Sequence, residues 1–143
     1  MSEDEKLSFD KSIGGISGKK IMVVEDDDFL RDIIARKLSR QGCSLVYAHD
    51  GEKALEMVER EMPDIILLDI LLPGINGFDL LEKFKLNPII QHIPVILFSN
   101  LSQESDIEKG KKLKASRFLV KATVSLDEVI QQIKEVLEET KMK

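Results

Sequence analysis

Five side chains with acidic, hydroxyl or ammonium groups directly follow short apolar runs in this sequence. They are Glu25, Asp26, Asp69, Ser99 and Lys121. Carboxylates that lie close together in a partly dry cleft repel one another, so they remain ionised only beside a cation. Mg²⁺ prefers hard oxygen ligands and needs only one or two carboxylates from a protein. A divalent metal beside a free aspartate suits phosphoryl transfer, in which the carboxylate attacks phosphorus.

The apolar runs predict the elements that must hold these groups. The runs cover residues 21–24, 45–48, 65–68, 95–98 and 118–120. Each is apolar at consecutive positions, which is typical of parallel strands covered on both faces. The segments between them carry helix signatures, at about residues 27–41, 50–62, 77–85, 103–114 and 125–140. This alternation predicts an α/β fold with a doubly wound, five-stranded parallel sheet in a flavodoxin-like three-layer sandwich.

The order of the strands decides which of the polar groups meet. With the order 2-1-3-4-5, the carboxyl ends of the first and third strands are neighbours. Glu25, Asp26 and Asp69 then share one edge of the sheet with Ser99 and Lys121. We expect Mg²⁺ among the carboxylates, with Lys121 neutralising charge on the transferred group and Ser99 donating a hydrogen bond to it.

The composition favours a single soluble domain. The chain has 143 residues, of which 43% are hydrophobic and 33% charged, enough for one core and a solvated surface. A net charge of −5 disfavours direct binding to nucleic acid. No apolar run approaches the ~20 residues that span a bilayer, and Cys43 is the single cysteine, so we expect a cytoplasmic protein. Residues 1–18 lack any periodicity and predict a flexible tail before a domain at 19–143.

Four segments together resemble the receiver domain of two-component response regulators, of the chemotaxis-regulator type. They read IMVVEDD at 21–27, LLDILLPGINGFDLL at 67–81, PVILFSN at 94–100 and FLVKA at 118–122. The resemblance covers about residues 20–140. It implies a phosphoacceptor domain that receives a phosphoryl group from a sensor histidine kinase or a phosphotransfer protein. It also implies a protein that assists its own phosphorylation without being a dedicated enzyme.

The resemblance gives the acidic residues distinct roles. It implies that Asp69 is the phosphoacceptor and also a metal ligand, and that Asp26 binds Mg²⁺ or Mn²⁺ directly. Glu25 would bind the metal through water, and the main-chain carbonyl of Leu71 would be a further ligand. Glu25 stands where an aspartate is commoner in the family.

The resemblance also implies a switch. Ser99 matches the switch hydroxyl, Lys121 the lysine that contacts the phosphoryl group, and Phe118 the aromatic side chain that changes rotamer. Phosphorylation adds charge at Asp69 and draws Ser99 inward, which makes room for Phe118. The helix at 103–114, the strand at 118–120 and the helix from 125 would then form the surface for a downstream protein or a phosphorylation-dependent dimer; otherwise the chain would be a monomer.

Four further positions depart from the family pattern. Ala122 replaces the usual proline after Lys121; without proline a cis peptide bond costs about 3 kcal/mol more, which disfavours the family's cis bond and leaves cis and trans open here. Asn100 replaces a small residue and narrows access to the phosphoacceptor or adds a donor beside it. Leu71 and Leu101 are apolar where the family's side chains can steer the hydrolytic water, which predicts slow self-dephosphorylation.

Two alternatives stay open. A phosphatase of the haloacid dehalogenase kind also uses an aspartate nucleophile at a strand end, but it needs a second aspartate where this chain has Leu71. A receiver-like interaction module that is never phosphorylated is kept open by Ala122 and Asn100.

Overall fold

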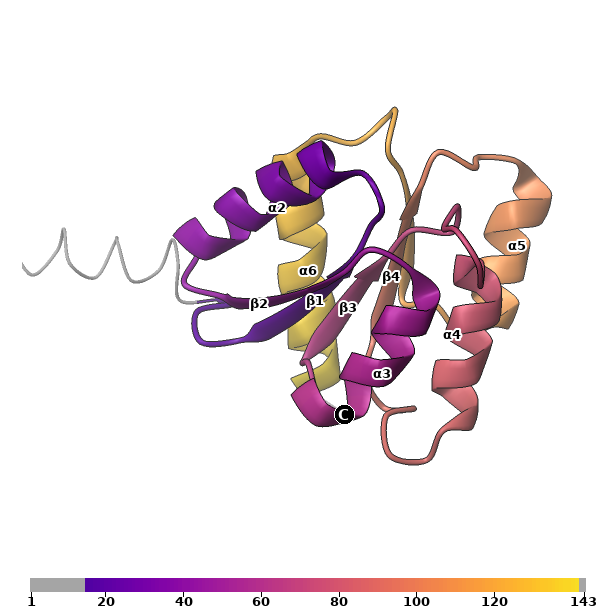
Figure 1. Cartoon of the computed structure of the whole chain (residues 1–143). Coiled ribbons are helices and arrows are strands. Elements are labelled where there is room, and N and C mark those ends of the chain that lie inside the picture. Colours follow the sequence, from indigo (N-terminus) through magenta and orange to yellow (C-terminus); the bar gives the residue numbers. More distant parts are fainter. Residues whose placement is uncertain (1–14, 142–143) are drawn as a thin grey trace, which may run out of the picture.

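The computed structural model describes residues 15–141 as a five-stranded parallel sheet enclosed by helices (Figure 1). The strands are β1 (Lys20–Val24), β2 (Ser44–Ala48), β3 (Ile65–Leu68), β4 (Val95–Ser99) and β5 (Arg117–Val120). The helices are α2 (Asp28–Arg40), α3 (Gly51–Glu61), α4 (Gly77–Leu86), α5 (Glu104–Lys112) and α6 (Leu126–Lys141). All strand pairs are parallel, in the order β2-β1-β3-β4-β5. The predicted fold class and strand order are confirmed.

The consecutive apolar residues of the strands supply two separate hydrophobic cores. In β1, Met22 and Val24 point into the core that contains residues of α3 and α4, with side chains near α5 packed on its border. Ile21 and Val23 point into the opposite core, which contains residues of α2 and α6. Successive side chains of a strand face opposite sides of the sheet, so a central strand needs apolar residues at every position. Figure 1 shows the sheet between these two layers of helices.

Short polar side chains begin the helices. Asp27, Asp50 and Asn76 accept hydrogen bonds from free main-chain N–H groups at the starts of α2, α3 and α4. Such caps satisfy donors that have no partner within the helix. Every predicted strand and helix is present, and the observed ends lie within two residues of the predicted ones.

Helix α5 contributes few buried side chains to its contact with the sheet. Gly110 is the one buried residue among its nine. A Cβ atom at Gly110 would lie 3.0 Å from the side chain of Leu97 and 3.1 Å from that of Phe118. The absence of a side chain at Gly110 therefore lets α5 approach β4 and β5 and leaves room for the ring of Phe118.

The start of the packed domain differs from the sequence prediction. Residues 1–14 of the predicted tail lie outside the described residues, whereas residues 15–18 form a turn. Within that turn Ile16 is fully buried in the core between the sheet and the layer of α2 and α6. The Ile16 carbonyl accepts a hydrogen bond from the Lys19 N–H at 3.1 Å, and Gly18 donates one to the Gly42 carbonyl at 2.9 Å. The packed structure thus includes part of the segment that we assigned to the tail.

No helix within residues 15–141 has the length and apolar character needed to cross a bilayer.

Replacing Ile16 with alanine tests the role of this turn. Because Ile16 is fully buried, we expect Ile16→Ala to lower the free energy of unfolding by about 2–4 kcal/mol in urea titrations. Ile89→Ala is the matched control, since Ile89 is 55% exposed and should change the value by less than about 0.5 kcal/mol. Equal stabilities of the two variants would contradict the assignment of Ile16 to the core.

Candidate functional site

The ends of β1 and β3 bring the predicted acidic residues together. These strands are neighbours, and Val24 pairs with Leu68, so the residues that follow them lie at the same edge of the sheet. Glu25, Asp26 and Asp69 each offer a carboxylate oxygen within 4.8 Å of the others. Glu25 and Asp69 are buried, whereas Asp26 is exposed. The cluster therefore has two enclosed carboxylates and one that opens to solvent.

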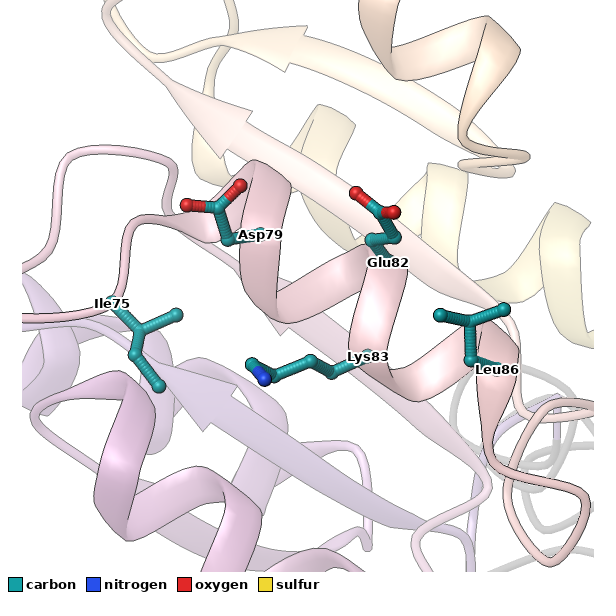
Figure 2. Close-up of a pocket in the computed structure, with 5 residues that line it drawn as sticks. All are labelled: Ile75, Asp79, Glu82, Lys83 and Leu86. Atoms are coloured by element: carbon teal, nitrogen blue, oxygen red, sulfur yellow. The ribbon is translucent and has the colours of Figure 1, made fainter.

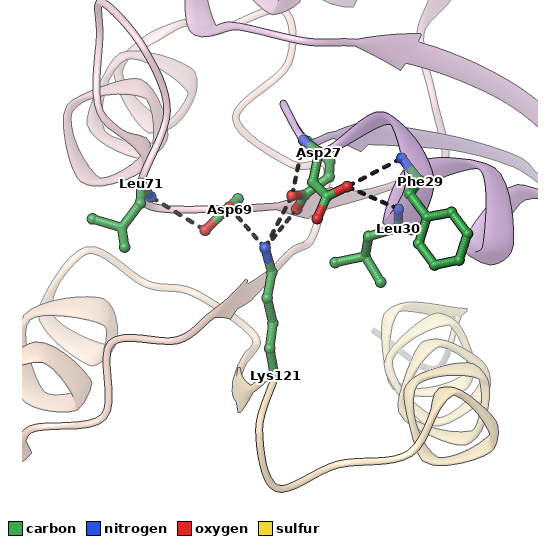
Figure 3. Close-up of polar contacts among 7 residues, drawn as sticks. Asp27, Phe29, Leu30, Asp69, Leu71 and Lys121 are labelled. Carbon is green, nitrogen blue, oxygen red and sulfur yellow. Dashed lines mark hydrogen bonds and ion pairs between the residues drawn. The ribbon is translucent and has the colours of Figure 1, made fainter.

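Lys121, directly after β5, places its ammonium group between the two buried carboxylates. Its Nζ lies 2.9 Å from Asp69 Oδ2 and 3.0 and 2.9 Å from the two oxygens of Glu25 (Figure 3). The main-chain N–H of Lys121 also donates to the carbonyl of Ser99 at 2.9 Å. This bond fixes the backbone of the lysine against β4. All peptide bonds in residues 15–141 are trans, including the one between Lys121 and Ala122.

The enclosed charges change the titration of the site. Burial raises the pKa of Glu25 to about 7, and the nearby charge of Asp69 adds to this, although the hydrogen bond from Lys121 opposes it. Burial alone would lower the pKa of Lys121, but its hydrogen bonds to Asp69 and Glu25 outweigh burial and raise that pKa. Lys121 therefore stays cationic at neutral pH, while Glu25 exchanges a proton near pH 7.

Besides Lys121, main-chain N–H groups also donate hydrogen bonds to the two buried carboxylates. The N–H of Leu71 donates to Asp69 Oδ1 at 3.2 Å, so each oxygen of Asp69 has its own donor. The N–H of Asp27 donates to Glu25 Oε1 at 3.3 Å. Sequence reasoning missed both bonds. The sequence could have indicated these two bonds, because an acidic side chain often accepts a hydrogen bond from the main-chain N–H two residues further along the chain.

Gly77 sets the path of the loop that follows Asp69. Its N–H donates to the carbonyl of Ile70 at 2.8 Å, which closes the loop onto the start of α4. A Cβ atom at this position would overlap the main-chain carbonyl of Asp69 and the Cα of Ile70. Only a residue without a side chain fits here, so the close approach of α4 to the end of β3 depends on this glycine.

Ser99 is the last residue of β4 and carries an unusual hydroxyl group. The residue is fully buried, and its Oγ has no hydrogen-bond partner among residues 15–141. A buried hydroxyl without a partner carries a desolvation cost that a ligand oxygen can remove. Phe118, half-buried on β5, packs at the border of the core beside α5. The structure thus places Ser99 and Phe118 on the neighbouring strands β4 and β5.

The oxygen atoms of the cluster fit a hard divalent cation. The set contains three carboxylates and no sulfur or imidazole, which matches the preference of Mg²⁺ and Mn²⁺. The carbonyl of Leu71, predicted as a further ligand, stays a prediction, since what the structure records for this residue is its N–H bond to Asp69. Asp26 is the exposed member of the set, so its carboxylate opens to solvent.

The surface hollow of greatest volume that we describe lies apart from the acidic cluster. It measures about 400 Å³ and is lined by Asp79, Glu82, Lys83 and Leu86 of α4 and by Ile75 of the preceding loop (Figure 2). None of the clustered carboxylates borders it. The chemistry at the carboxyl edge of the sheet therefore does not depend on this hollow.

The fold and site define a doubly wound α/β domain with an acidic centre at its strand ends, and comparison with known proteins identifies the family. A family model for the response regulator receiver domain matches residues 21–134. The chain therefore belongs to the receiver domain family of two-component response regulators.

Individual relatives agree with this membership. Response regulator PleD of Caulobacter vibrioides is 39% identical over 102 residues, which cover 71% of this chain and 22% of PleD. The chain thus spans less than a quarter of that relative. The CheY-like receiver domain protein of Methanospirillum hungatei has a TM-score of 0.80 at 28% identity, with 88% of this chain and 98% of that chain covered. The phosphorylated cyanobacterial phytochrome response regulator RcpA has a TM-score of 0.72 at 29% identity, with 85% and 93% covered.

The raised pKa of Glu25 predicts a pH-dependent stability. Because the pKa is about 7 in the folded protein and 4.5 as its ordinary value, the folded state holds its proton more tightly, so stability falls as pH rises from about 4.5 to 7. Glu25→Gln removes this titration. Without metal, we expect the variant to be more stable than the natural protein by about 1–2 kcal/mol at pH 8, with a smaller difference at pH 4.5.

Thermal unfolding at both pH values measures this difference. Glu108→Gln, an exposed carboxylate on α5, is the control and should show no such pH dependence. A difference between Glu25→Gln and the natural protein that stays constant from pH 4.5 to 8 would contradict the prediction.

Proposed function

We propose that Asp69 accepts a phosphoryl group from a phosphohistidine of a sensor histidine kinase or phosphotransfer protein. The supporting observation is the buried carboxylate of Asp69, which is one of the three clustered acids. It accepts hydrogen bonds from Lys121 and from the N–H of Leu71. Membership of the receiver family supports a phosphoacceptor role in two-component signalling. RcpA, a structural relative, is itself a phosphorylated response regulator.

The side chains supply most of what the transfer needs. A carboxylate oxygen of Asp69 forms a bond to phosphorus as the bond from phosphorus to the histidine nitrogen breaks. Lys121 keeps its proton and neutralises negative charge on the phosphoryl oxygens. Glu25, Asp26 and Asp69 would hold Mg²⁺ or Mn²⁺, which supplies further positive charge when bound. The free hydroxyl of Ser99 then donates to a phosphoryl oxygen.

The same step would operate the switch. Phosphorylation of Asp69 adds about −1.5 to −2 charge and three acceptor oxygens, and these draw Ser99 toward the site. Phe118, next to the space left by Gly110, can then change rotamer. The surface of α5, β5 and α6 is the proposed contact for a downstream protein in the cytoplasm, without direct contact to nucleic acid. It would also be the dimer surface if phosphorylation causes dimerisation.

The phosphatase alternative lacks its second acid. Position 71, two residues after Asp69, carries a leucine whose side chain is 55% exposed and cannot transfer a proton. A phosphoacceptor needs no such acid, because the phosphoryl group stays on the aspartate. The site therefore favours an acceptor over a hydrolase.

Phosphorylation by a small phosphodonor tests the proposal. Incubated with such a donor and Mg²⁺, the protein should gain the mass of one phosphoryl group, and Asp69→Asn should lose at least about 90% of this gain. Asp32→Asn, an exposed aspartate on α2, is the matched control. Removal of Mg²⁺ with a chelator should also suppress the gain. No Asp69-dependent mass increase and no binding of beryllofluoride would instead support an unphosphorylated interaction module.

The two leucines beside the site predict a long-lived phosphoryl group. Leu71 is more than half exposed and Leu101 is half-buried, and neither side chain can orient or activate a water molecule. We expect Leu71→Asn combined with Leu101→Glu to speed loss of the phosphoryl group by about tenfold or more, measured from the decay of the phosphorylated mass after the donor is removed. Leu86→Asn, an exposed leucine on α4, is the control. An unchanged lifetime would show that these positions do not limit hydrolysis.

A further inference from the structure

Three lysines surround a small hollow at the end of the molecule opposite the acidic cluster. The hollow measures about 220 Å³ and is lined by Lys85, Lys112 and Lys114 together with Glu82, Leu86 and Leu113. It lies where α4 and α5 end, and both helices run antiparallel to the strands (Figure 1). The N–H of Ser116 donates to the carbonyl of Val95, which confirms that this edge holds the starts of β4 and β5. The lining residues carry a net positive charge in a chain of net charge −5.

These lysines lack acidic partners within residues 15–141. Lys20, Lys37, Lys53 and Lys121 each form an ion pair with a carboxylate, but Lys85, Lys112 and Lys114 form none. Glu82, the acid among the lining residues, lies exposed on α4 beside the larger hollow of Figure 2. Three ammonium groups against the one carboxylate of Glu82 therefore leave a net positive charge around this hollow.

The lysines also repel one another. Lys85 is half-buried, and its Nζ donates long hydrogen bonds to the carbonyls of Gln91 and Ile93, at 3.4 and 3.3 Å. Burial lowers the pKa of Lys85, and the positive charge of Lys114 lowers it further. An anion in the hollow would relieve this repulsion.

Lys114 lines the hollow from just beyond the end of α5. Lys114 has a φ of +68°, in the left-handed region that favours glycine. Lys114 follows Leu113, the C-cap residue of α5, and a left-handed residue commonly ends a helix in this way, here with the N–H of Ala115 donating to the carbonyl of Gly110 at 3.0 Å. A glycine would fit the backbone better but would remove the ammonium group from the hollow.

Helix ends alone explain only part of the cluster. The carbonyl ends of helices attract cations, and Lys85 lies in the last turn of α4, from which its Nζ donates to two carbonyls of the following loop. Lys112 and Lys114 donate no side-chain hydrogen bond within residues 15–141. Their charge is thus available to a ligand in the hollow.

We propose that the hollow formed by Lys85, Lys112 and Lys114 binds a small phosphate-bearing ligand through its dianionic phosphate group. Lysine ammonium groups bind phosphate as point charges, and Leu86 and Leu113 supply apolar walls for the rest of such a ligand. This site is separate from Asp69 and needs neither metal nor phosphoryl transfer.

Titration of the full chain with inorganic phosphate tests the site. The protein is kept in a metal chelator at constant ionic strength, and amide chemical shifts are followed by NMR. We expect saturable shifts at Leu86, Leu113 and Lys114. Lys112→Gln and Lys114→Gly should each raise the Kd for phosphate at least about fivefold. Lys114→Gly suits the positive φ, so that variant should fold and be at least as stable as the natural protein.

Lys111→Gln is the matched control, because Lys111 is exposed on the same helix and does not line this hollow. Its Kd should stay within about twofold of the natural value. Three results would overturn the proposal: shifts that rise linearly without saturation, an equal loss of affinity in Lys111→Gln, or shifts centred on Asp69, Ser99 and Lys121. Because the titration involves no phosphoryl transfer, its outcome is independent of whether Asp69 becomes phosphorylated.

Discussion

The rest of the candidate site depends on the contact of one ammonium group with two buried carboxylates. Glu25 and Asp69 are 2% and 4% exposed, and two like charges so enclosed repel strongly. Lys121 lies within 3.0 Å of both and supplies a positive charge that offsets part of this repulsion. Its backbone bond to Ser99 in turn requires β5 to lie beside β4. Strand order and site electrostatics are therefore linked through this lysine.

The position of the acidic site at the end of the strands explains why it is compatible with a stable domain. Both faces of the sheet are covered by apolar side chains, and the polar groups are confined to the edge where the strands end. There the loops can supply main-chain donors, as Leu71 does for Asp69. Gly77 keeps this loop close by admitting the carbonyl of Asp69 where any side chain would collide with it. The cost of burying the acids is thus offset by local donors and by Lys121.

Sequence patterns predicted most of the fold because the strands of a buried parallel sheet are apolar at consecutive positions, as residues 65–68 illustrate. The site followed from the fold, since the residues just after β1, β3 and β5 had to share one edge. Ile16 was missed because a single isoleucine between glycine and serine residues has no periodicity. The left-handed backbone of Lys114 was also invisible, because lysine gives no signal for a positive φ.

The acidic cluster and the three lysines of the hollow lie at opposite edges of the sheet. The helices run antiparallel to the strands, so their N-terminal ends, which favour negative charge, lie at the edge that holds Glu25, Asp26 and Asp69. Their C-terminal ends favour positive charge and carry Lys85, Lys112 and Lys114 at the opposite edge. At the first edge a lysine compensates the acids, whereas at the second no acid pairs with the lysines in the part of the chain that we describe. The dipoles of α4 and α5 thus favour the lysines at one edge of the sheet, whereas Lys121 stabilises the acids at the other.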